Sequence, residues 1–163
     1  MDLAFLKKVD LVKELTVPEL KTFSSKLKTV KYKESEFLIE ENKENDKLFI
    51  LYKGEVVISK KMTMIDDQEK IDKTFISLTA NNHAFFGEIG LLGLQKSTAT
   101  CKANTECILY TINQKDFISI CTSNPEIGFK MLLEISRKLS RLLEKTNEDV
   151  LKLTTALIYA LKG

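Results

Sequence analysis

The sequence predicts a small, mainly β domain with flanking helices, and three observations lead to this fold class. Short runs rich in Val, Ile, Thr and aromatic residues recur between polar breaks in the middle of the chain, as in a sandwich or jelly roll. Apolar residues recur every three or four positions near both ends, which is typical of helices. The length of 163 residues suits one domain, and the hydrophobic content of 44% supplies its core.

The N-terminal segment is expected to begin with helix. Thr16 and Glu19 have the spacing of a capping box, and Pro18 lies in the first turn, where proline is tolerated. Apolar residues then follow on one helical face until about residue 28, where the period changes.

Strands are expected from there to residue 113. The run KLFILYKGEVVISKK contains two strand-like segments that meet at Gly54, and TFISL, STATCKA and ECILYTI are three further strands. Residues 62–73 are polar and unpatterned, so we interpret them as a long hairpin loop.

After residue 113 the pattern favours two helices. Asn113 is expected to cap a short helix. Ser123, Pro125 and Glu126 then supply an N-cap, a first-turn proline and a capping-box acid for a longer helix that runs almost to the end.

The long helix carries an apolar stripe close to a heptad repeat. Its members are Leu132, Ile135, Leu139, Leu142, Thr146 and Val150, continued by Leu153, Leu157 and Leu161. We therefore divide the chain into a β-roll with N-terminal helices over residues 1–125 and a C-terminal helix over residues 126–163, which is predicted to form a homodimer.

Composition argues against several classes of function. The net charge of +2 lacks the basic excess of a dedicated nucleic-acid binder, and an apolar run of 18 residues, which a membrane span needs, is missing. The three cysteines are odd in number and have no CxxC spacing, and the single histidine is His83. We expect a cytoplasmic protein that is not an enzyme and holds no metal and no cofactor.

The stretch HAFFGEIGLLGLQKSTATCKA, residues 83–103, carries the candidate site. A turn that starts a helix presents backbone N–H groups that attract an anion, and Gly87 and Gly90 would let a ligand approach the backbone closely. Glu88 can accept hydrogen bonds from sugar hydroxyls, while Ser97 and Thr98 can donate to phosphate oxygens. Together they indicate a site for a sugar-phosphate.

These segments resemble the cyclic nucleotide-binding domain of catabolite-activator-like regulators, cyclic-nucleotide-dependent kinases and gated channels. The resemblance runs from about Leu11 to Leu143 and rests on LIEENKENDKLFILYKGEVVIS, FFGEIGLL, STATCKA and NQKDFISI, in that order. It implies an eight-stranded jelly roll with helices. The ligand, cyclic AMP or cyclic GMP, would lie between the phosphate-binding cassette and the long C-terminal helix.

The resemblance also implies a role for each cassette residue. Glu88 would hold the ribose 2′-hydroxyl, and Thr98 would donate a hydroxyl. The backbone N–H groups of Gly87, Ile89 and Gly90 would help to bind the cyclic phosphate. Two leucines of the C-terminal helix, at positions 142 and 143, lie where the helix should meet the base and could stack on it.

One departure from the family pattern is expected to weaken binding. The cyclic-nucleotide binders place an arginine nine or ten residues after the glutamate, where this chain has Ser97 preceded by Lys96. Arginine binds a phosphate through a two-pronged fork, whereas lysine is a point charge.

Two hypotheses about function remain open at this stage. The chain is either a sensor that binds a cyclic nucleotide or a related phosphate ligand such as a cyclic dinucleotide, with weakened affinity, or a degenerate scaffold without a nucleotide ligand. The scaffold would serve dimerisation or protein–protein interaction. The candidate ligand-binding residues are Gly87, Glu88, Ile89, Gly90, Lys96, Ser97 and Thr98. Because the chain ends soon after the long helix, we expect no helix-turn-helix and no nucleic-acid binding by this chain alone, and no membrane association.

Overall fold

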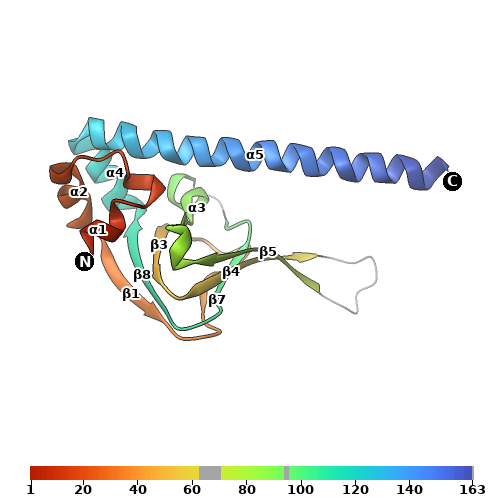
Figure 1. Ribbon diagram of the computed structural model, residues 1–163, viewed down its shortest axis with the longest axis horizontal. Coiled ribbons are helices and arrows are strands. Elements are labelled where there is room, and N and C mark those ends of the chain that lie inside the picture. The colour runs from red at the N-terminus through yellow and green to blue at the C-terminus, as the bar shows by residue number, and fades with distance from the viewer. Residues whose placement is uncertain (63–70, 94–95, 163) are drawn as a thin grey trace.

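The computed structural model describes residues 1–62, 71–93 and 96–162, and it shows a β-roll beneath one long helix (Figure 1). Eight strands form two four-stranded antiparallel sheets, in the orders β1–β8–β3–β6 and β2–β7–β4–β5. The strands are β1 (Lys28–Tyr32), β2 (Phe37–Ile39), β3 (Lys47–Lys53), β4 (Glu55–Met62), β5 (Ile71–Thr79), β6 (Phe85–Phe86), β7 (Thr100–Ala103) and β8 (Cys107–Asn113). The predicted jelly roll is therefore confirmed.

Strand β3 is buried on both faces, which explains its unbroken apolar run LFIL. Its side chains alternate between faces because strands have a period of two. Phe49 and Leu51 contribute to the core between the sheets, whereas Leu48 and Ile50 contribute to a second core beneath the helices. The β3–β4 turn at Gly54 has a φ of 96°, and a side chain there would meet the backbone of Glu106.

The helical elements are α1 (Leu3–Leu6), the 3₁₀ turn η1 (Asp10–Val12), α2 (Val17–Ser24), the 3₁₀ turn η2 (Ala80–Asn82), α3 (Glu88–Leu92), α4 (Gln114–Ser123) and α5 (Pro125–Lys162). Helices α1, α2 and α4 lie together at one end of the roll, whereas α5 runs along the roll and past it (Figure 1). The capping box of α2 is confirmed, because the Thr16 N–H donates to Glu19 Oε2 at 2.6 Å.

The start of α4 is also as predicted, but the start of α5 is not. The Asn113 side chain accepts a hydrogen bond from the Asp116 N–H at 2.8 Å and so caps α4. Ser123 is the last residue of α4 rather than the N-cap of α5. The helical hydrogen bonds of α4 continue to the Asn124 N–H, which donates to the Ile120 carbonyl, so the backbone at Ser123 is helical where an N-cap would be extended.

Helix α5 has two parts with different surroundings. Ile127, Met131 and Ile135 are buried in the core that it shares with the N-terminal helices. Further along, the helix extends past the roll, and Leu153 and Leu157 are 71% and 59% exposed (Figure 1). The predicted stripe thus changes from core to open surface along its length.

Strands β4 and β5 include the ends of the segment that we interpreted as a hairpin loop. β4 continues to Met62, β5 begins at Ile71, and residues 63–70 of that interpretation lie outside the described residues. None of the helices that the structure describes has a stretch long and apolar enough to span a bilayer.

Candidate functional site

A cavity of about 380 Å³ lies between α5, α3 and the sheet that contains β4, β5 and β7. This volume is in the range of about 300–1,000 Å³ that is typical of small-molecule sites. Six of the seven predicted ligand-binding residues line it: Gly87, Glu88, Ile89, Gly90, Ser97 and Thr98. Residues 87–90 and 97–98, which are separate in the sequence, thus line the same cavity.

The seventh predicted residue, Lys96, is not among the lining residues. It is exposed, and its backbone forms a bridge with Glu44. Next to it, the Ser97 N–H donates to the Lys43 carbonyl at 2.8 Å, and the Ser97 carbonyl accepts from the Asn42 N–H at 2.9 Å. This pairing turns Ser97 towards the interior and leaves Lys96 at the outer edge.

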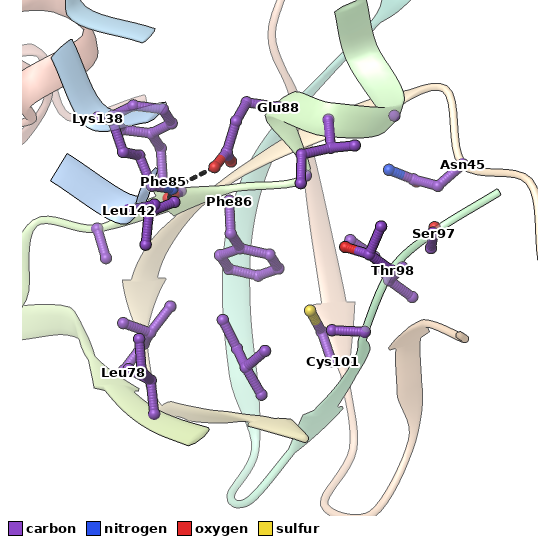
Figure 2. A pocket seen from close by; sticks show the side chains of 18 of the residues that line it. Asn45, Leu78, Phe85, Phe86, Glu88, Ser97, Thr98, Cys101, Lys138 and Leu142 are labelled. Atoms are coloured by element: carbon purple, nitrogen blue, oxygen red, sulfur yellow. Dashed lines mark hydrogen bonds and ion pairs between the residues drawn. The ribbon is translucent and has the colours of Figure 1, made fainter. Parts of the chain in front are cut away.

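Glu88 is buried and already has a partner from α5. Its Oε1 lies 2.9 Å from the Lys138 Nζ, and the Glu88 side chain is only 6% exposed. The same ammonium donates to the Phe85 carbonyl at 2.7 Å and lies 4.3 Å from the centre of the Phe85 ring (Figure 2). The carboxylate expected to accept the ribose hydroxyl is therefore neutralised by an internal cation.

Sequence reasoning did not identify Lys138, although the pattern contains a signal. The buried face of α5 includes Met131 and Ile135, and the next positions on that face are Lys138 and Leu142. A lysine at a core-facing position needs a nearby acceptor, because burying an unpaired charge is costly. The signal indicates that a partner exists, but it does not say which carboxylate provides it.

The two cassette glycines are required by the protein's own packing. Gly87 has a φ of 89°, and a side chain on it would meet the Lys47 carbonyl. A side chain on Gly90 would meet the backbone and amide of Asn45, which also lines the cavity. The missing side chains thus make room for the β2–β3 connection, which is a requirement of the fold in addition to the predicted approach of a ligand.

The rest of the cavity wall is mainly apolar. Ile58, Ile76 and Leu78 line it from β4 and β5, and Leu142 lines it from α5. Cys101 lines it from β7, and burial raises the pKa of its thiol to about 12, so the thiol stays protonated (Figure 2). Within the described part of the chain, no three His, Cys, Asp or Glu side chains gather as metal ligands would.

The order of the segments and the cassette geometry agree with a comparison of the sequence with family models. The model of the cyclic nucleotide-binding domain matches residues 29–124. The chain belongs to this family. The cyclic nucleotide-binding domain family is defined by a ligand-binding module, and both sheets of the roll lie largely within the matched range.

Individual relatives agree with the family assignment. The chain is 31% identical over 139 residues to a cAMP-activated global transcriptional regulator of Salmonella typhimurium, a match that covers 85% of this chain and 61% of the regulator. It is 32% identical over 119 residues to a cGMP-dependent protein kinase of Eimeria tenella, which covers 72% of this chain and 11% of the kinase. The chain thus spans about three fifths of the regulator's length.

Solved structures support the fold. A cyclic nucleotide-binding domain from Methylobacillus flagellatus superposes with a TM-score of 0.75 at 18% identity, covering 91% of this chain and 80% of that one. At this identity the likeness concerns the fold alone.

Proposed function

We propose that the chain is a non-catalytic regulatory domain whose cavity binds a cyclic nucleotide or a related phosphate ligand with low affinity. The observation that carries this proposal is the meeting of six predicted ligand-binding residues around one cavity of about 380 Å³. The functions of the relatives agree with it, since one is activated by cAMP and another depends on cGMP.

Each cassette group has a part in this proposal. The backbone N–H groups of Gly87, Ile89 and Gly90 bind the phosphate, since the first N–H groups of a helix have no partner within it. Thr98 adds a hydroxyl, and Glu88 accepts the ribose hydroxyl while still paired with Lys138. The carboxylate has two oxygens and several acceptor positions, so a second donor is chemically acceptable.

The missing arginine explains the low affinity. Ser97 stands in its place, and the neighbouring Lys96 is exposed outside the lining. A charge-assisted hydrogen bond contributes about 1.5–3 kcal/mol. Its loss therefore weakens binding by about tenfold to somewhat over a hundredfold.

A thermal-shift screen followed by titration calorimetry tests the proposal. The purified chain is titrated with cyclic AMP, cyclic GMP and cyclic dinucleotides up to millimolar concentration. A ligand at a hundred times its Kd adds about 2.7 kcal/mol of stability, which raises the melting temperature measurably. Thr98→Val should weaken the response and Lys96→Gln should leave it unchanged. If every nucleotide leaves melting and heat unchanged, the cavity does not bind this class.

The Glu88–Lys138 ion pair favours a second candidate, a scaffold that works without a nucleotide. An acceptor that is buried and neutralised by its own chain needs no ligand to satisfy it. In that case the chain functions in dimerisation or protein–protein interaction. The same screen separates the two candidates, because this scaffold shows no nucleotide response.

Both candidates include a homodimer through α5. The part of the helix beyond the roll exposes Leu143, Val150, Leu153 and Leu157, at 55% or more each. These positions are spaced by seven, three and four residues, which fits the heptad repeat of a coiled coil. A reducing compartment such as the cytoplasm would keep the three cysteines as the free thiols seen in the structure.

A further inference from the structure

The part of α5 that extends past the roll carries a second apolar stripe beside the predicted dimer seam (Figure 1). We call residues 146–162 the tail of α5. The seam continues in the tail with Val150, Leu153 and Leu157, and all three are exposed. A second set of residues is also exposed and again has spacings of three and four. Its members are Leu151, Thr154, Ile158 and Leu161.

The two stripes face different directions. Successive residues of an α-helix are rotated by about 100° around its axis. By this rule Leu151 lies about 100° from Val150, whereas Leu157 lies only about 20° from it. The centres of the two stripes are therefore about 90° apart. A partner helix that covers the seam leaves the second stripe largely in water.

The second stripe is confined to the tail. The positions that would continue it towards the roll at the same spacing are Ser140, Glu144 and Asn147, which are all polar. The seam, in contrast, continues towards the roll through Leu143 and Leu139. The first half of α5 thus has one apolar stripe on its outer side, and the tail has two.

Charged side chains gather on the remaining side of the tail. Lys152 lies 3.8 Å from Glu148 and 3.9 Å from Asp149, measured between ammonium and carboxylate atoms. From Val150 to Leu161, Lys152 is the only charged residue of the sequence. The tail therefore has one polar outer side and an apolar surface that covers about a quarter turn more than a single seam needs.

We infer that two α5 dimers associate through their tails and form a four-helix bundle. In such a bundle each helix packs against two neighbours, which lie about 90° apart around it. The helix of a two-stranded coiled coil has one partner and one narrow seam. The two stripes of the tail match the bundle. The inference rests on the homodimer of the proposed function and does not depend on a nucleotide ligand.

A second dimer of this chain is the partner that fits the second stripe. An identical stripe on another copy has the same spacing and, like this one, no charge, so the two can form a self-complementary contact that closes as a tetramer. Each roll lies beside the first half of its helix, so antiparallel tails place two rolls at each end of the bundle (Figure 1). A membrane surface fits less well, because helices that lie on membranes are rich in Lys and Arg on the polar side.

Analytical ultracentrifugation from micromolar to millimolar protein tests the inference. The mass of the wild type should rise from two chains to four as the concentration increases. Leu151→Glu/Ile158→Glu places two carboxylates in the second stripe and leaves the seam unchanged. This variant should remain at two chains throughout, because the bundle would have to bury unpaired charges.

Thr155→Glu/Tyr159→Glu is the matched control. It adds the same two carboxylates to the tail, but on the side that carries Glu148 and Lys152. Its mass should rise to four chains as that of the wild type does. Far-ultraviolet circular dichroism establishes that each variant keeps its helix content before its mass is measured.

Several results would overturn the inference and are distinguishable. A wild type that stays at two chains up to millimolar concentration refutes the bundle, while the dimer stands. A wild-type monomer refutes both. Four chains in Leu151→Glu/Ile158→Glu would show that another surface joins the dimers. Co-sedimentation with anionic phospholipid vesicles that is lost in this variant would assign the second stripe to a membrane surface instead.

Discussion

Lys138 places its ammonium 2.9 Å from the carboxylate of Glu88, and this ion pair joins α5 to the turn that carries the predicted ribose acceptor. The ammonium also holds the Phe85 carbonyl at 2.7 Å, just before the cassette begins. The Lys138 side chain therefore links the position of α5 to the turn that lines the cavity.

The first prediction concerns the stability that this ion pair provides. Lys138→Met keeps most of the apolar stem and removes the charge, which leaves the buried Glu88 carboxylate without its cation. An unsatisfied buried group of this kind costs about 1–3 kcal/mol. Denaturant unfolding should show this loss, and the double variant Glu88→Gln/Lys138→Met should recover much of it.

Lys145→Met is the matched control for that experiment. It removes the same charge from an exposed position of the same helix, and its unfolding midpoint should not change. Equal stability of Lys138→Met and the wild type would show that water replaces the ammonium at Glu88 without cost.

The second prediction concerns the position of the missing arginine. Ser97→Arg places a guanidinium beside Thr98 at the cassette wall and should strengthen cyclic AMP binding by about 1.5–3 kcal/mol. Glu88→Ala in that background should remove the gain, because the ribose loses its acceptor while the phosphate contact remains. Titration calorimetry on the three proteins measures both effects.

The wild-type titration decides how the second prediction is read. Tight binding by the wild type would show that the backbone and hydroxyl donors suffice without a cassette arginine. Absence of binding in Ser97→Arg would instead favour the scaffold without a ligand, since the remaining groups of the cassette are unchanged in that variant.

The third prediction concerns the exposed stripe of α5. Leu153→Glu puts a charge in the predicted seam, where Leu153 is 71% exposed in the single chain, and should convert the dimer to a monomer. Light scattering at tens of micromolar protein measures the mass. Thr155→Glu is the control, because at 100° per residue it points away from the seam and should leave the dimer intact. A wild-type monomer at this concentration would refute the dimer.

The fourth prediction concerns the ion pair between α2 and α5. The Lys130 Nζ lies 2.8 Å from Glu19 Oε1, and this hydrogen bond, together with that from the Thr16 N–H, holds the pKa of Glu19 below its ordinary value of 4.5. A lowered carboxyl pKa stabilises the fold at pH values above the ordinary one, and the contribution is lost as pH falls through the folded-state pKa. Glu19→Gln should therefore lower the urea midpoint at pH 7 and reduce its dependence on pH below 4.5.

The design of that experiment separates the charge from the cap. Glutamine can still accept from the Thr16 N–H, so the capping box of α2 is retained. Glu126 also contacts Lys130, at 3.0 Å, but it is 78% exposed, and Glu126→Gln should change little. If both variants behave alike, the α2–α5 pair has no special role in stability.

Much of the local structure could be predicted because its causes lie within a few residues. The Thr16–Glu19 capping box and the Asn113 cap depend on side chains that reach their own turn. Ser123 was wrongly predicted as a cap because Asn124, one residue later, is equally suited by composition. In the structure the helical hydrogen bonds of α4 extend to the Asn124 N–H, so Ser123 stays helical.

The lining of the cavity was predictable only in part. Lys96 and Ser97 are neighbours, and neighbouring residues of an extended segment point to opposite sides. The pairing of Ser97 with Asn42 and Lys43, far away in the sequence, decides which one faces inward. A one-residue shift of that pairing would exchange the two.

The sequence by itself determined the fold family, five of the eight strands and the cassette residues from Gly87 to Thr98, because these depend on local pattern. Only the tertiary structure decided which groups complete the cavity. Lys138 and Arg141 come to it from α5, and they do so because the first turns of α5 bury Met131 and Ile135 in the helical core. That packing sets the rotation of the helix, and the rotation brings the Lys138 ammonium to the Glu88 carboxylate.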